Sequence, residues 1–175
     1  MGLAMKNHTI QNEKTMMRSQ QRTDPGSVTV EMVLVTPILL VLLFGIIEFG
    51  LIFKDVAILK QATREGARIA AVGETTTQII SRVQASAATI SPDALTIELK
   101  YRVYSGGWPS WDSAPTLGDV SSGETAQNNA PQGAQIRVQA SYPHQLISGR
   151  LFSGLADNPD SQTMTLTTSS VMRRE

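Results

Sequence analysis

The chain has 175 residues, with 15 basic and 15 acidic side chains and a formal net charge of zero. A chain without excess positive charge has no global field that attracts nucleic acid, so we expect no nucleic-acid partner. Cysteine is absent, which excludes disulfide bonds, thiolate metal sites and a thiol nucleophile. The length suits one modest domain with additional segments.

Residues 1–26 are polar, lack hydrophobic periodicity and end with Asp24, Pro25 and Gly26. This composition is typical of a disordered segment, and we expect a cytoplasmic leader that can be cleaved off. The Lys and Arg side chains of the leader outnumber its acidic side chains, and the basic flanks of membrane helices stay in the cytoplasm. We therefore predict that the remainder of the chain, after its membrane segment, lies on the far side of the membrane.

An apolar run extends from Met32 to Phe53 and contains Glu48 as its only charged residue. A helix of about 20 apolar residues crosses the hydrocarbon core of a bilayer. A buried helix of a soluble domain would keep a polar face, and a cleaved signal sequence has an apolar region of only about 7–15 residues. We therefore predict a retained single-pass transmembrane helix over residues 27–53, with Pro37 inside it.

The helical pattern continues beyond the membrane as an amphipathic segment. In it, Ala62, Gly66 and Ala70 form a stripe of small residues at a spacing of four. Such a stripe lets another backbone approach closely, as in assembling helices, although alanine is also simply a good helix former. The other side of the segment has a row of basic residues, which suits an acidic partner or a solvated surface. This row consists of Lys60, Arg64 and Arg68.

Residues 54–90 are predicted to contain this helical extension and a second, short helix. Gly73 is expected to end the first helix. Residues 75–88 then have apolar side chains at helical spacing, which indicates an amphipathic second helix.

Residues 91–175 are predicted to form a small antiparallel sheet domain. Residues 95–104 and 134–142 alternate strictly between apolar and polar side chains, as strands with one buried face do. Residues 163–171 have the Thr-rich composition of a third strand. The short apolar segment 145–152 either covers the sheet or touches the membrane interface. With the helices, about three strands predict an α+β fold in which a long N-terminal helix precedes the sheet.

Residues 105–133 are predicted to be a long loop between the first two strands. A loop of this length is usually functional or disordered. It contains Trp108 and Trp111. If these rings are exposed, they can bind a partner protein or a sugar, whereas rings folded back onto the sheet would pin the loop in place.

Residues that could carry out chemistry are sparse. The histidines His8 and His144 have no metal-ligand spacing around them, and the sequence has neither a phosphate-binding glycine loop nor a nucleophile elbow. We therefore expect no enzymatic activity, no cofactor, no bound metal and no small-molecule substrate. A catalytic site would require the fold to bring His144 beside Asp112 or Asp119.

Glu31 is the fifth residue after Gly26 and stands at the edge of the apolar run. An unpaired acidic side chain deep in the membrane costs about 3 kcal/mol, so Glu31 in that position requires a positive partner. Cleavage between Gly26 and Ser27 would create such a partner, namely the N-terminal ammonium of a neighbouring subunit. Alternatively, Glu31 marks the cytoplasmic interface of an uncleaved anchor.

Three segments carry a family resemblance: GSVTVE from Gly26, IIEFG from Ile46 and ATREGAR from Ala62. Together with the terminal SSVMRRE from Ser169, they resemble the TadE-like proteins. These are minor pilins, or pseudopilins, of the bacterial tight adherence (Tad/Flp) pilus system. The resemblance implies a fold in which a long N-terminal helix packs on a small antiparallel sheet.

The resemblance also implies a location and partners. A prepilin peptidase would cut between Gly26 and Ser27, and Glu31 would be the acidic residue typical of processed pilins. The protein would sit in the bacterial inner membrane with its N-terminus in the cytoplasm and its C-terminal domain in the periplasm or outside the cell. It would act with other pilins and Tad assembly proteins in building a pilus for surface adhesion. The alternative is a signal-anchored envelope binding module that uses the loop of Trp108 and Trp111.

Overall fold

The computed structural model of the protein describes residues 25–122, 125–158 and 160–175. Most of the predicted leader, including His8, lies outside these residues. The chain divides into two compact units, Met1–Leu42 and Leu43–Glu175, and each is described by itself. Helix α1 (Pro25–Val72) begins in the first unit and ends in the second.

In the first unit, α1 begins at Pro25, just before the predicted start of the helix. Proline suits the first turn because backbone N–H groups there have no partner within the helix. The helix continues through Pro37, and Thr36 Oγ1 donates a hydrogen bond of 2.6 Å to the Met32 carbonyl oxygen. From Val28 to Val72, α1 is the one helix in the described part of the chain that is long and apolar enough to cross a membrane.

The second unit begins with the rest of α1, which ends before Gly73 as predicted. Gly73 has a φ of 109°, a conformation that glycine adopts without strain. Helix α2 (Thr76–Ser86) follows and begins with a capping box. Thr75 and Gln78 each accept a hydrogen bond from the backbone N–H of the other, which satisfies two donors at the start of the helix.

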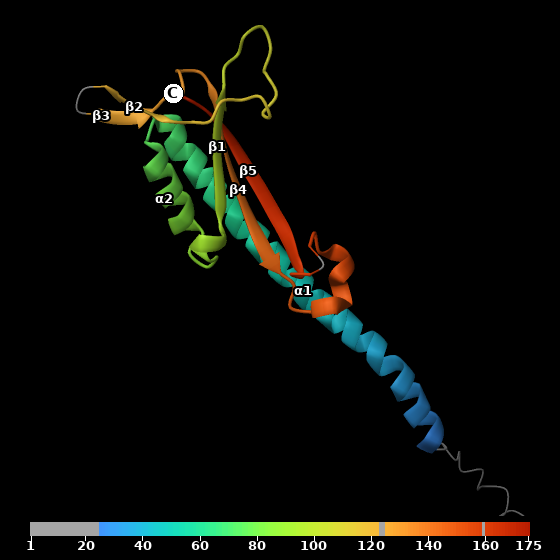
Figure 1. Ribbon diagram of the computed structural model, residues 1–175. Helices are drawn as coiled ribbons and strands as arrows, with labels where there is room; N and C mark the ends of the chain where they lie inside the picture. Colours follow the sequence, from blue (N-terminus) through green and yellow to red (C-terminus); the bar gives the residue numbers. More distant parts are fainter. Residues whose placement is uncertain (1–24, 123–124, 159) are drawn as a thin grey trace, which may run out of the picture. The chain divides into compact units, whose positions relative to one another are not determined.

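The predicted α+β fold is confirmed by a three-stranded sheet in the second unit (Figure 1). Strands β1 (Thr96–Arg102), β4 (Gln135–Gln145) and β5 (Thr163–Arg173) lie in the order β1-β4-β5, and both pairs are antiparallel. The predicted alternation places the apolar side chains of β4 in the core, where three of them are fully buried. These three are Ile136, Val138 and Ala140.

Strand β4 is longer than predicted because it continues through Pro143. Proline has no N–H, so it is tolerated only where a strand needs no donor. The pairing of β1 with β4 ends at Thr96 and Ser141, so β1 does not reach Pro143. Because of this extension, His144 is part of strand β4 and pairs with Met164 of β5.

The predicted loop 105–133 is not entirely a loop. It contains a two-stranded hairpin formed by β2 (Asp119–Ser122) and β3 (Thr125–Asn128). The carboxylate of Asp119 accepts two hydrogen bonds of 2.7 Å from Thr76, one from its backbone N–H and one from its hydroxyl. The side-chain amide of Asn128 donates to the carbonyl oxygens of Ala70 and Glu74, each at 2.9 Å. The sequence pattern missed this hairpin because short polar strands have no apolar alternation.

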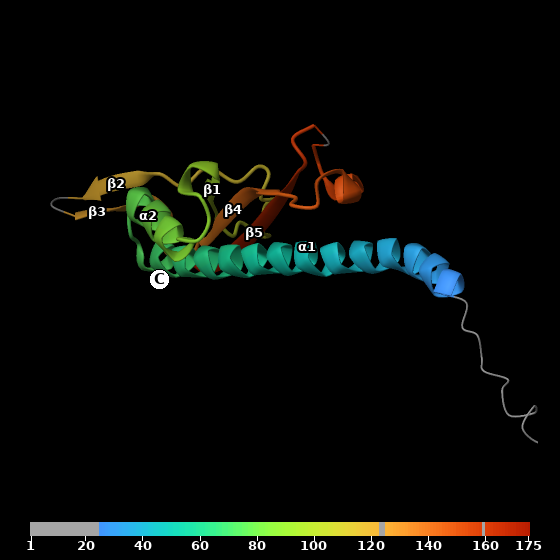
Figure 2. The same cartoon turned by 90° about the horizontal axis from the view of Figure 1, so that it is seen from below.

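Within the second unit, α2, the sheet and the hairpin lie on the same side of α1 (Figure 2). The short helix η1 (Pro92–Ala94) leads from α2 to β1. The core forms where α1 meets α2 and the buried face of the sheet. Its largest fully buried apolar side chains are Leu59, Ile79, Val83, Ile136 and Val138.

The stripe of small residues on α1 lies in this core. Ala62 and Ala70 are fully buried, and Gly66 is buried between them. A Cβ at Gly66 would overlap Val83 Cγ2 of α2 and would lie 3.3 Å from Val138 Cγ1 of β4. The stripe therefore allows close approach, as predicted, but its partners are elements of its own chain. In this fold it is not available to a neighbouring subunit, which corrects the interpretation of the three residues as assembly contacts.

We predict that Gly66→Ala destabilises the second unit. The added methyl group has no space, and overpacking costs about 1–3 kcal/mol, more than the gain of up to about 1 kcal/mol from placing alanine in a helix. Gly50→Ala is the matched control, because a Cβ at Gly50 meets nothing within 4 Å. Thermal unfolding in detergent should show a lower midpoint for Gly66→Ala alone. An equal or higher midpoint for both variants would contradict the close packing.

Candidate functional site

Glu48 is the only charged residue of the apolar run, yet its side chain is almost completely buried, with an exposed fraction of 1%. Its two carboxylate oxygens accept hydrogen bonds from consecutive backbone N–H groups that follow β4. Ile147 N lies 3.2 Å from Oε1, and Ser148 N lies 2.8 Å from Oε2. Hydrogen bonds to an ionised carboxylate are among the stronger ones in proteins. Glu48 therefore fastens the segment after the sheet to α1.

His144 connects Glu48 to a second carboxylate on α1. Its Nδ1 lies 2.7 Å from Asp55 Oδ2, and its Nε2 lies 3.7 Å from Glu48 Oε1. The first distance is a hydrogen bond and the second is too long for one. Asp55 also pairs with Lys54 at 3.3 Å. Because Glu48, Asp55 and His144 are all buried, we name these three residues the polar cluster.

The polar cluster is suited to holding parts of the chain together. Buried polar groups are costly unless they are paired, and here each carboxylate has a hydrogen-bond donor from the other end of the second unit. No group of His, Cys, Asp and Glu side chains in the described residues is arranged to hold a metal ion. A catalytic site would have required His144 to lie beside Asp112 or Asp119. Instead, His144 forms its hydrogen bond with Asp55.

Sequence reasoning missed the polar cluster because its members are far apart in the chain. His144 and Asp55 are separated by 89 positions, and Ser148 and Glu48 by 100. One signal was present, namely that Glu48 is a lone charge in an apolar run. Such a residue requires a partner, and only the fold shows that the partner is in the same chain.

The predicted processing site lies in the first unit. The described part of α1 includes Gly26 and Ser27 in its first turn and Glu31 shortly after them. Glu31 is exposed, and within the residues that the structure describes it makes no ion pair. A Cβ at Gly26 would meet nothing within 4 Å, so the structure sets no steric demand for glycine there.

The two tryptophans pack on arginine side chains of the sheet. The Trp111 ring centroid lies 4.2 Å from the guanidinium carbon of Arg102 and 4.9 Å from that of Arg137. Trp108 lies 5.3 Å from Arg102 and makes an edge contact with Tyr104, with 5.4 Å between ring centroids. Such cation–π contacts stabilise the loop against the sheet. Trp108 is 40% exposed and Trp111 is half-buried, so both rings remain partly accessible.

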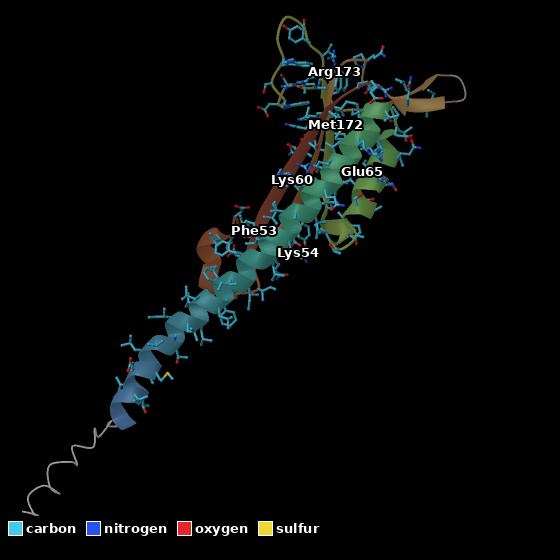
Figure 3. The ribbon with its side chains drawn as sticks, turned by 180° about the vertical axis from the view of Figure 1, so that it is seen from behind. Phe53, Lys54, Lys60, Glu65, Met172 and Arg173 are labelled. Carbon is cyan, nitrogen blue, oxygen red and sulfur yellow. The ribbon has the colours of Figure 1, made fainter. Side chains whose placement is uncertain are left out.

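The basic row on α1 is only partly free. Glu65 accepts hydrogen bonds from Arg68 at 3.0 Å and from Arg82 of α2 at 2.7 Å, whereas Lys60 and Arg64 face solvent. Figure 3 shows Lys60 and Glu65 along the same part of α1. The hydrogen bonds from Arg68 and Arg82 lower the pKa of Glu65 to about 2.

We predict that Glu48→Ala destabilises the second unit by about 2–4 kcal/mol, because two backbone N–H groups lose their acceptor. Glu48→Gln should cost less, since its amide oxygen still accepts one of the two hydrogen bonds. Chemical unfolding in detergent, followed by near-ultraviolet circular dichroism, measures both values. Glu31→Ala is the control and should leave the stability unchanged, because its side chain is exposed. Equal stability of Glu48→Ala and the wild type would show that Glu48 does not fasten the segment.

A second prediction concerns acid stability. The folded-state pKa of Glu65 lies below its ordinary value of 4.5, so the ion pairs stabilise the fold above pH 4.5 and this contribution disappears as the pH falls toward 2. Glu65→Gln should therefore lose less stability than the wild type between these two pH values. Unfolding midpoints measured across that range test this, and parallel curves for the two proteins would contradict it.

Comparison with known proteins gives one match. The family model described as TadE-like protein matches residues 26–68. Searches of curated proteins and of solved structures found no match. The match includes Gly26, Glu31, Glu48 and Gly66, but not the C-terminal segment from Ser169, whose resemblance stays a prediction. Residues 26–68 thus match TadE-like proteins, as the sequence motifs indicated.

Proposed function

We propose that the protein is a membrane-anchored, pseudopilin-like subunit that supports assembly of a Tad/Flp-type pilus for surface adhesion. The observation that carries this proposal is the match of residues 26–68 to TadE-like proteins, because it coincides with the exposed apolar part of α1. An isolated helix with exposed apolar side chains is suited first to a bilayer and then to packing among other helices.

Glu31 is the residue we assign to subunit assembly. It lies on the exposed apolar helix and has no ion-pair partner among the described residues, unlike Glu48, which its own chain satisfies. A carboxylate at the edge of the bilayer gains most from a cation of another chain. The N-terminal ammonium of a neighbouring processed subunit would be such a cation.

A prepilin peptidase is the partner we assign to the Gly26–Ser27 bond. This bond lies in the first turn of α1, whose N–H groups have no partners within the helix. Opening that turn therefore costs little and would expose the bond to a peptidase. The mature helix would then start at Ser27.

We further propose that the protein sits in the bacterial inner membrane with its N-terminus in the cytoplasm. The basic leader supports this orientation. The C-terminal unit would lie in the periplasm or outside the cell and would act with other pilins and Tad assembly proteins. We assign it no catalytic role, because His144 is buried and its hydrogen-bonding carboxylate belongs to the same polar cluster.

The decisive measurement is the intact mass of the protein purified from membranes of cells that carry the complete pilus system. We expect a mature chain that begins at Ser27, and Gly26→Leu should leave the chain uncut. Glu31→Ala should be processed and inserted normally but should reduce pilus formation. Gly50→Ala, a change at an unhindered glycine of the same helix, is the control that should alter neither result. An uncut wild-type chain, together with normal pili in the Glu31→Ala strain, would overturn the proposal.

A further inference from the structure

The segment that follows β4 exposes large apolar side chains. It contains the short helix η2 (Gly149–Leu155) and the residues just before it. Ile147 is 69% exposed, Leu151 is 50% exposed and Leu155 is 39% exposed. A soluble surface rarely groups such side chains without a partner. We name Ile147, Leu151 and Leu155 the apolar patch.

The segment that carries the apolar patch lies beside α1, near the C-terminal end of its apolar run. A Cβ at Gly45 of α1 would lie 3.4 Å from the ring of Phe152 in η2, and Glu48 holds the N–H groups of Ile147 and Ser148. All of these residues belong to the second unit. Exposed apolar side chains also lie on this part of α1, among them Ile46, Phe49 and Phe53.

The length of α1 places this region at the membrane interface. The apolar run that follows Glu31 extends from Met32 to Phe53, and at about 1.5 Å per residue it covers about 33 Å. The hydrocarbon core of a bilayer is only about 30 Å thick. The end of this run near Lys54 therefore reaches the headgroup boundary. The contacts of the segment with Glu48 and Gly45 lie about 9–14 Å below Lys54 along the helix.

Backbone polar groups at that depth must be satisfied within the protein. Here the polar cluster performs this task, since Glu48 accepts from the two N–H groups that precede η2. Leu146 N also donates to the carbonyl oxygen of Gln162 at 3.0 Å. Among the residues of this segment whose side chains the structure describes, the large exposed ones are apolar, as is typical of segments that lie in the interface plane.

We propose that the apolar patch inserts into the outer boundary of the same bilayer that α1 crosses, as a second point of membrane attachment. The patch would contact lipid acyl chains. The polar cluster would fix the position of the patch along α1, because Glu48 binds the N–H groups of Ile147 and Ser148. This inference rests on the membrane anchoring within the proposed function, but not on the role in a pilus. The attachment would hold the second unit against the membrane surface.

Fluorescence quenching by brominated lipids tests this inference on the full chain in vesicles. In a Trp108→Phe, Trp111→Phe background, a single tryptophan replaces Leu151. We expect lipids brominated near the headgroup to quench its emission several-fold more than the emission of a single tryptophan at Val120. Val120 lies in the hairpin, is 45% exposed and serves as the matched surface control.

A third variant separates failure of this inference from failure of the proposed anchor. A single tryptophan at Leu40, which is 44% exposed within the apolar run, should be quenched by lipids brominated deep in the acyl chain. If Leu40→Trp is quenched but Leu151→Trp is not, α1 spans the membrane and the patch does not touch lipid. If neither is quenched, the anchor itself is wrong, and this inference fails with it. Circular dichroism of each variant confirms that the sheet is retained.

Discussion

The second unit depends on the burial of one carboxylate. Glu48 stands in a helix that is otherwise apolar for more than 20 residues, where an unpaired charge is costly. The chain meets this cost by returning after its second sheet strand to donate two backbone N–H groups to Glu48. Glu48 thus determines where the segment that follows β4 meets α1.

Helix α1 performs two tasks that require different surfaces. Along its C-terminal half, small residues let α2 and β4 approach so closely that a single methyl group on Gly66 has no space. Along its N-terminal half, large apolar side chains are exposed and suit lipid or other helices. The polar cluster of Glu48, Asp55 and His144 lies where one surface gives way to the other. Through its hydrogen bonds the cluster connects α1 to β4 and to the segment that follows it.

The sequence predicted those parts of the fold that depend on local pattern. The apolar run, the stop at Gly73 and the alternating strands were all recognisable, because each reflects the periodicity of one element. Contacts between distant elements were not predictable. The hairpin that ends in Asn128 has polar strands without alternation, and the partners of Glu48 and His144 lie about 100 residues away. The stripe at Ala62, Gly66 and Ala70 shows the same limit, since its spacing indicates close packing but not the partner.

Two acidic residues of one helix illustrate how structure separates similar sequence signals. Glu31 and Glu48 are both charges within or beside an apolar run, and a sequence pattern treats them alike. Glu48 has its donors within the chain, whereas Glu31 has no ion pair among the described residues. A carboxylate that its own chain satisfies serves folding, and an exposed one is what a contact with another molecule would require. Glu48 therefore fixes where the segment after β4 meets the helix, whereas the contact with another subunit that we propose for Glu31 rests on its exposure.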